Sequence, residues 1–156
     1  MKIEKNYDFR QRFDEVHKPN RRDYSLKAES NEFVITEDTV IVVPADADST
    51  VMTAAHDLQD YFFKSMDMSL KLKKGEACAN SISYAVSSAV AKDAFILEVT
   101  ANGVKITGNM SKDAFCGSVY LEDQLNLREA PYIEIQTLER KKLFTPRIVH
   151  SGWGIE

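Results

Sequence analysis

The sequence predicts an α+β fold, an α/β sandwich with a mixed, largely antiparallel sheet of about seven strands and two helices packed on one face. From residue 32 onward, short β-branched or alternating runs recur and indicate strands. Two longer stretches, 51–62 and 114–125, repeat apolar residues at helical spacing. An Asn-Gly pair between two alternating runs indicates a hairpin, and hairpin-linked strands favour antiparallel pairing under a helical layer.

Length and composition bound the functions to consider. A chain of 156 residues with 44% hydrophobic and 28% charged residues is typical of one globular domain with its own core. No apolar run approaches the roughly 18 residues of a membrane helix, and no signal-peptide core follows the charged start, so a soluble chain without a membrane span is expected. The net charge of -4 argues against a nucleic-acid partner.

Residues 1–31 differ from the rest of the chain in charge. They carry a net charge of +2, whereas the other 125 residues carry -6. Their apolar residues are few and do not repeat at the spacing of a long helix or strand. We therefore expect a peripheral N-terminal arm, lying on the surface of the domain or on another domain, with a partly disordered leader as the alternative.

The first half of the domain reads as two strands, a helix and two further strands. The runs 31–36 and 39–43 are separated by Glu37-Asp38 and predict two strands joined by a tight turn. Pro44 ends the second strand, and the acceptor side chains of residues 46–50 can cap the helix that follows. The alternating run 70–73 and the run 82–86 predict the next two strands.

The second half begins with the clearest local signal. Residues 94–100 and 104–107 flank Asn102-Gly103, which predicts a hairpin with a positive φ at the turn. Ser111 or Asn109 can cap the second helix. Gly117 lies inside that helix and indicates a close approach of helix and sheet. The strand 132–136 follows, and residues 144–150 begin a further apolar element.

Motifs that carry chemistry are scarce. The six glycines form no phosphate-binding spacing, and there is no hydrolase elbow. Cys78 and Cys116 share no Cys-x-x-Cys unit, so neither a metal site nor dithiol chemistry is predicted. No cofactor is predicted either. Cys116 is expected to pack near the buried face of the second helix and Cys78 to lie in a loop. Whether the two cysteines pair stays open.

The histidines give one candidate cluster. His17 belongs to the arm, and His56 lacks the second histidine of a zinc-protease helix, so a solvated or capping role is expected for it. Arg147, His150 and Trp153 form the polar and aromatic group that most resembles a ligand-binding site, with an exposed tail as the alternative. No nucleophile, base and orienting group can be assembled, so the chain alone is not expected to be an enzyme, and no catalytic residue is predicted.

A family resemblance rests on residues 93–109 and 115–125. The pattern is an aromatic-led strand at Phe95, the Asn102-Gly103 turn, a strand that ends in a small-residue break, and a helix with the step Gly117-Ser118-Val119-Tyr120. Together with the upstream strand that ends in Pro44, this resembles the non-catalytic α/β domain that precedes the barrel in family 20 β-hexosaminidases, α-glucuronidases and related large glycoside hydrolases. The resemblance covers roughly residues 32–150.

The resemblance implies a domain without catalysis of its own. In those enzymes the catalytic acids lie in a (β/α)₈ barrel, which needs about 250 residues. The Pro146-Arg147 step looks like the family's junction with the first barrel strand. In hexosaminidases a second arginine, four residues further on, contacts the terminal sugar. Here that position is Ser151, which sets the chain apart from hexosaminidase specificity.

We therefore expect three segments: the arm 1–31, an accessory domain 32–142, and a linker or first barrel strand 143–156. The expected partner is a downstream barrel of the same polypeptide, held through an apolar edge near residues 143–150, with glycans reached through that parent enzyme. The parent is expected to be either cytoplasmic or exported. The alternative is a free-standing carbohydrate-binding or protein-interaction module, in which Trp153 and exposed tyrosines stack on sugar rings.

Overall fold

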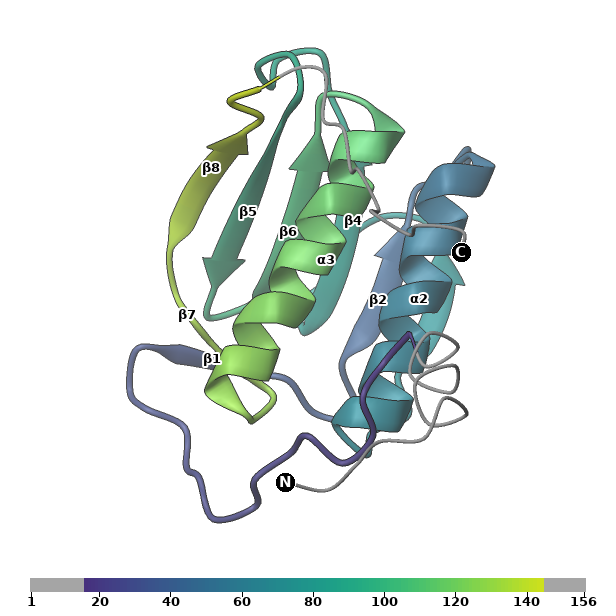
Figure 1. Cartoon of the computed structure of the whole chain (residues 1–156). Helices are drawn as coiled ribbons and strands as arrows, with labels where there is room; N and C mark the ends of the chain where they lie inside the picture. The colour runs from purple at the N-terminus through teal and green to yellow at the C-terminus, as the bar shows by residue number, and fades with distance from the viewer. Residues whose placement is uncertain (1–15, 145–156) are drawn as a thin grey trace, which may run out of the picture.

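In the computed structural model, which describes residues 16–144, two helices cover one face of a six-stranded sheet (Figure 1). The strand order across this sheet is β3-β2-β4-β6-β5-β8. Its strands are β2 (Val40–Val43), β3 (Lys71–Lys74), β4 (Ser81–Val86), β5 (Ala94–Thr100), β6 (Gly103–Gly108) and β8 (Thr137–Lys141). The helices are α2 (Ser49–Ser65) and α3 (Ser111–Arg128).

The pairing of the strands is mixed. β2 runs parallel to β3 and to β4, and β4 runs parallel to β6. β5 is antiparallel to both β6 and β8. A separate antiparallel pair, β1 (Glu32–Val34) with β7 (Tyr132–Glu134), lies beside the sheet near the C-terminal end of α3. The predicted α+β class, the mixed sheet and the placement of both helices on one face are confirmed.

One predicted connection is wrong in part. The turn at Glu37-Asp38 is present, because the Thr39 N–H donates to the Thr36 carbonyl at 2.9 Å. The two runs that it joins do not pair with each other, however. Phe33 of β1 lies opposite Ile133 of β7, whereas Ile41 of β2 lies opposite Leu72 and Ile82 in the six-stranded sheet. β1 therefore pairs with β7, about 100 residues away in the chain, and not with the adjacent strand β2.

The hairpin between β5 and β6 is confirmed. Thr100 pairs with Gly103, whose φ of 146° is positive as expected. A Cβ at Gly103 would also lie 2.4 Å from the Ser81 carbonyl oxygen, so the neighbouring strand β4 requires glycine there as well. The edge strand β8 was not predicted, because four of its five residues are polar and it lacks a β-branched apolar run.

The helix ends follow two capping patterns. Asp48 caps α2, and its Oδ1 accepts the Val51 N–H at 2.9 Å, as the acceptor-rich segment 46–50 predicted. For α3 the expected caps Ser111 and Asn109 are wrong. Met110 is the N-cap residue, and its own N–H donates to the Asp113 carboxylate at 3.1 Å. The Ser111 hydroxyl instead donates to Asp48 at 2.6 Å, which links the two helix starts.

The core lies between the helices and the inner face of the sheet. Its largest fully buried side chains include Tyr61 and Phe62 of α2, Ile106 and Leu97 of the sheet, and Leu121 of α3. The buried face of α3 differs from the expected one. Cys116 and Val119 are exposed, because they lie outside the stripe of α3 that faces the sheet and α2. That stripe consists of Ala114, Gly117, Ser118, Leu121, Glu122 and Leu125.

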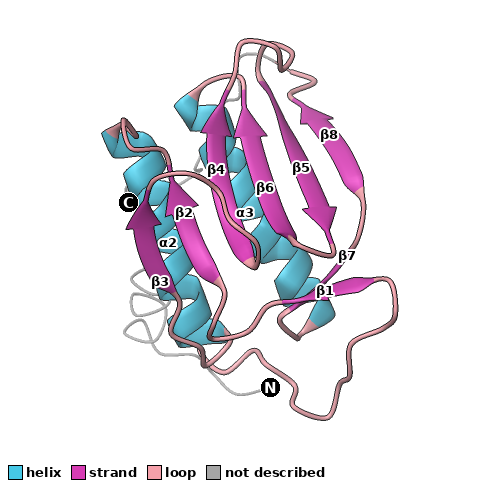
Figure 2. Cartoon of the chain, turned by 180° about the vertical axis from the view of Figure 1, so that it is seen from behind, coloured by secondary structure: helices cyan, strands magenta, loops and turns pink. Residues whose placement is uncertain are grey.

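The outer surface of the molecule carries both charged and apolar side chains. The open face of the sheet, which Figure 2 shows toward the viewer, carries exposed charged residues on alternate strand positions. They include Lys71, Lys73, Glu98, Lys105 and Glu139. On the helices, Phe63, Val119 and Leu127 are 63%, 42% and 80% exposed. Phe63 lines a hollow with Ser69 and Leu70, and Leu127 lines another with Tyr132 and Leu138. No helix in the described residues is both long and apolar enough to cross a bilayer.

Candidate functional site

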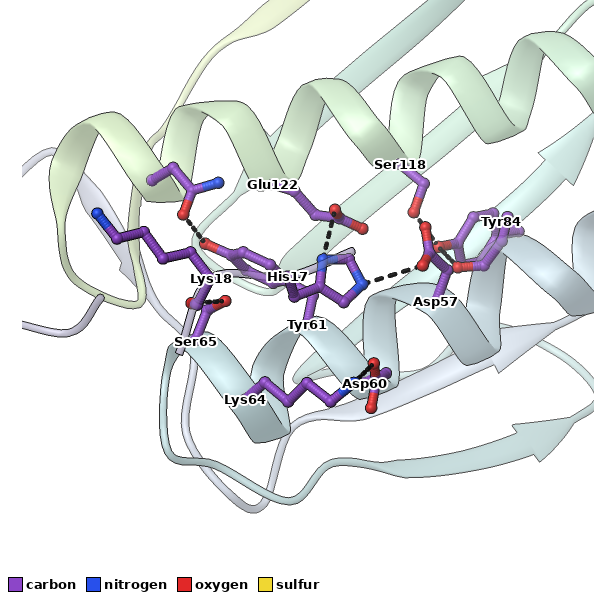
Figure 3. Close-up of polar contacts among 12 residues, drawn as sticks. His17, Lys18, Asp57, Asp60, Tyr61, Lys64, Ser65, Tyr84, Ser118 and Glu122 are labelled. Atoms are coloured by element: carbon purple, nitrogen blue, oxygen red, sulfur yellow. Dashed lines mark hydrogen bonds and ion pairs between the residues drawn. The ribbon is translucent and has the colours of Figure 1, made fainter. Parts of the chain in front are cut away.

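Three polar side chains meet between the two helices on the side away from the sheet (Figure 3). His17 enters from the N-terminal segment, Asp57 belongs to α2 and Glu122 belongs to α3. His17 is 7% exposed and Glu122 is 6% exposed, so the chain buries an imidazole and a carboxyl group at one place. Buried ionisable groups of this kind are uncommon unless they are paired or bind an ion.

The imidazole of His17 lies between the two carboxyl groups. Its Nε2 hydrogen-bonds Asp57 Oδ1 at 2.9 Å, and its Nδ1 lies 3.8 Å from Glu122 Oε2. The ring also packs edge-on against Tyr61, with ring centroids 5.5 Å apart. A nitrogen of His17 and one oxygen from each carboxyl group all lie within 4.8 Å of one another. This is a set of ligand atoms of the types that bind transition metals.

Glu122 is the least satisfied member of the cluster. Its Oε1 is fully buried and has no hydrogen-bond partner among residues 16–144. Burial raises the pKa of Glu122 to about 8, and the negative charges of Asp57 and Asp123 add to the rise. In the absence of a further cation, the carboxyl group therefore holds its proton near neutral pH.

A second buried polar contact lies one turn away on the same helices. The hydroxyl groups of Tyr84 and Ser118 are 2.6 Å apart, and the Tyr84 hydroxyl also reaches the Ala54 carbonyl at 3.4 Å. Burial raises the pKa of Tyr84, so its phenol stays neutral in the usual pH range. This pair joins β4 to α3 through the core and is not open to a ligand, since both residues are buried.

The segment that carries His17 also closes the C-terminal ends of both helices. The N–H groups of Asn20 and Arg21 donate to the carbonyls of Lys64 and Ser65 at the end of α2, and the Asp23 N–H donates to the Glu129 carbonyl after α3. Last-turn carbonyls have no partner within a helix. The side chains of Arg21 and Arg22 donate to the Asn126 and Met66 carbonyls. Arginine at this end also complements the helix dipole.

The residues predicted from the sequence do not belong to this cluster. Arg147, His150 and Trp153 lie outside the described residues, and their ligand-binding role stays a prediction. His56 is exposed, as expected, and Cys78 and Cys116 are both free and exposed. His17 was assigned to the arm but not to a site.

The sequence held one usable signal for the missed cluster. Ser118 and Glu122 lie one turn apart on the stripe that also carries Leu121 and Leu125, so polar residues share the buried face of α3. Nothing local points to His17, because it lies 40 residues from Asp57 and 105 residues from Glu122 in the chain.

A shallow hollow beside α2 brings together residue types used in hydrolases. It is about 410 Å³ in volume and is lined by His56, Gln59, Asp60, Phe63, Ser69 and Leu70. Asp60, however, pairs with Lys64 at 2.8 Å. No hydrogen bond joins His56 to Ser69 or to Asp60, although the structure describes all three. These groups are therefore not arranged as a nucleophile and its base.

No protein-family model matches the chain, and no curated protein matches it. The fold is similar to solved structures of glycoside hydrolases. A GH20 β-N-acetylhexosaminidase from Streptomyces coelicolor A3(2) aligns at 18% identity with a TM-score of 0.62, over 76% of this chain and 25% of that one. The β-hexosaminidase of Streptomyces plicatus aligns at 16% identity with a TM-score of 0.60, over 81% of this chain and 26% of that one.

CpGH84D gives a third match, at 13% identity with a TM-score of 0.53, over 81% of this chain and 24% of that one. The chain therefore spans about a quarter of the length of each of these three proteins. At such low identity the likeness establishes a shared fold alone.

Proposed function

We propose that this chain is a non-catalytic accessory domain of a larger glycoside hydrolase, which packs its helical layer against a downstream (β/α)₈ barrel and supports it. The observation that carries the proposal is the fold, which makes up about a quarter of each of three glycoside hydrolase chains. Phe63, Val119 and Leu127 stand exposed on the helices, whereas the open face of the sheet is charged. Exposed apolar side chains on the helices are available for contact with another domain.

The similar solved structures support the same reading. Three glycoside hydrolases contain this fold as about a quarter of their chains, so the fold occurs there together with other parts of the same polypeptide. In this proposal residues 1–31 are the peripheral arm, 32–142 the accessory domain, and 143–156 the start of the connection to the barrel. Arg147, His150 and Trp153 then contact ligand only in the parent enzyme.

The first experiment tests the absence of catalysis. The purified 156-residue chain is assayed on aryl glycosides of N-acetylhexosamine and glucuronic acid, and we expect no turnover. Turnover that a single carboxylate substitution abolishes would contradict the proposal. The reading frame downstream of codon 156 gives the complementary observation. We expect several hundred further residues with alternating strand and helix periodicity and paired acids near strand ends.

The second experiment tests the docking surface in the full polypeptide. Val119→Asp places a charge on the outward side of α3, and we expect faster proteolytic release of the domain and a lower Tm of the barrel. Thr137→Asp is the matched control, because it places the same charge on the exposed edge strand β8. Equal effects of the two substitutions would contradict docking through the helical layer.

The alternative, a free-standing sugar-binding module, predicts a different result. Calorimetry of the chain against hexosamine, glucuronic acid and xylan fragments would then give a micromolar affinity that Trp153→Ala abolishes. We expect no heat of binding.

A further inference from the structure

The cluster of His17, Asp57 and Glu122 has the composition of a metal site. We infer that these three residues bind one divalent transition-metal ion, with Zn²⁺ as the favoured ion, and that the ion fastens the N-terminal segment to both helices. The inference does not depend on the parent enzyme, because all three ligands lie in this chain.

The distances fit such an ion. Zinc binds nitrogen and oxygen ligands at about 2.0–2.2 Å, so adjacent ligand atoms lie about 3–3.5 Å apart. His17 Nε2 and Asp57 Oδ1 are 2.9 Å apart, so the Asp57 carboxyl group must move back slightly for an ion to replace the proton and bind both atoms. Since an ion binds one ring nitrogen only, Glu122 must turn toward that ion. The terminal torsion of glutamate is broad, and such a rotation costs little.

The burial of Glu122 provides the independent observation. The side chain is more than nine-tenths buried, and in the part of the chain that the structure describes its Oε1 has no hydrogen-bond partner. A buried, unpartnered carboxyl oxygen destabilises the fold and calls for an explanation such as a bound ion or water. A cation coordinated by Oε1 supplies the missing partner.

The balance of charge also favours a cation. Asp57 and Glu122 face each other across one imidazole, and Asp123 follows Glu122 in α3. In the described part of the chain, no lysine or arginine forms an ion pair with Asp57 or Glu122. Binding of an ion would release the proton that Glu122 otherwise holds, and a divalent ion would then neutralise both carboxylates, which a single imidazole cannot do.

The donor set selects among ions. An imidazole nitrogen suits zinc and related transition metals, whereas Ca²⁺ and Mg²⁺ prefer six or more oxygen ligands, or several retained waters. Three protein ligands leave a fourth tetrahedral position, which a water molecule would take. We therefore expect Zn²⁺ to bind and Ca²⁺ and Mg²⁺ to have no effect at the same concentration.

The experiment uses the whole 156-residue chain in a Cys78→Ser, Cys116→Ser background, so that the two exposed thiols cannot bind zinc. After treatment with EDTA and its removal, the chain is titrated with ZnCl₂ by calorimetry and followed by thermal unfolding. We expect one Zn²⁺ per chain, a rise in Tm of several degrees, and recovery of the original Tm when EDTA is added.

The variants locate the ion. Glu122→Gln and Asp57→Asn keep the shape of each side chain and should weaken Zn²⁺ binding at least tenfold, and His17→Ala should do the same. His56→Ala is the matched control, because His56 is exposed and lies next to Asp57 in α2. Far-UV circular dichroism checks that each variant is folded. No zinc binding by the folded parent chain, or binding that all three cluster variants leave unchanged, would overturn the inference.

Discussion

Arg128, the last residue of α3, contacts two other segments of the chain through its guanidinium group. Its Nε donates to Glu32 Oε1 at 2.7 Å and a terminal nitrogen donates to Glu32 Oε2 at 3.2 Å, so the pair is bidentate. The same nitrogen donates to the Lys27 carbonyl at 2.9 Å. Because Glu32 begins β1, this one arginine ties the small sheet and the N-terminal segment to α3.

The Glu32–Arg128 pair predicts an acid-dependent stability. The hydrogen bonds from Arg128 hold the pKa of Glu32 below its ordinary value of 4.5. The folded state thus favours the ionised form, and the pair stabilises the fold above about pH 4.5 and loses this contribution as the pH falls through the lowered pKa. Glu32→Gln should lower the Tm by a few degrees at pH 7 and by much less at pH 3.

Thermal unfolding at several pH values measures this difference. Glu37→Gln is the control, since Glu37 is exposed and lies in the turn before β2. A difference in Tm between the wild-type chain and Glu32→Gln that stays constant from pH 7 to pH 3 would contradict the assigned ion pair.

The buried hydrogen bond between Tyr84 and Ser118 is expected to contribute to the stability of the fold. Ser118→Ala removes one hydroxyl group and leaves the Tyr84 hydroxyl with the longer contact to Ala54 alone. We expect a loss of about 1–2 kcal/mol in the free energy of unfolding, measured by urea titration with an unchanged m-value.

A double substitution tests the cause of that loss. Tyr84→Phe with Ser118→Ala removes both polar groups, so its cost should be smaller than the sum of the two single costs. Additive costs would show that the two hydroxyl groups act independently.

At the scale of elements, Gly117 sets the distance between α3 and the sheet. A Cβ at this position would lie 2.6 Å from Ile106 Cγ2 and 3.1 Å from Phe95 Cδ2. Both partners are core side chains of the sheet, and Ile106 is fully buried and β-branched, so neither can move freely. The close approach predicted from a glycine within the helix is therefore confirmed.

Gly117→Ala should destabilise the protein in spite of its better helix propensity. The propensity gain is about 1 kcal/mol, whereas overpacking of a core costs about 1–3 kcal/mol. We expect a net loss in the free energy of unfolding by chemical denaturation. Cys116→Ala is the control, because the preceding residue Cys116 is exposed, and it should change the free energy of unfolding little. A stabilised Gly117→Ala variant would mean that α3 can move away from the sheet at no cost.

Elements with a strong local pattern were predicted well. The strand 94–100 agrees with β5 at both ends, and α2 and α3 contain the two predicted apolar repeats. The polar edge strand β8 was missed, because its place depends on pairing with β5 and not on its own composition. The pairing of β1 with β7 was missed for a related reason, since local sequence does not show which distant strand offers a free edge.

At the scale of the whole molecule, the site could not be predicted from the sequence. His17, Asp57 and Glu122 meet only because α2 and α3 pack side by side and the N-terminal segment crosses their ends. The excess of positive charge in residues 1–31 was recognised from the sequence, but its contacts with the ends of the helices were not predicted. Two of those basic residues, Arg21 and Arg22, lie against carbonyl groups at the ends of the helices.

This placement of the N-terminal segment has a consequence for biosynthesis. Residues 17–23 leave the ribosome first, yet their partners at the end of α3 follow more than 100 residues later. At about 5–20 residues per second, synthesis of that interval takes roughly 5–20 seconds. The carbonyl groups at the end of α2 follow after 44 residues and can be closed from then on, but those of α3 do not yet exist. The nascent chain must therefore keep its first segment available until α3 has emerged, and only then can the fold close on both helices.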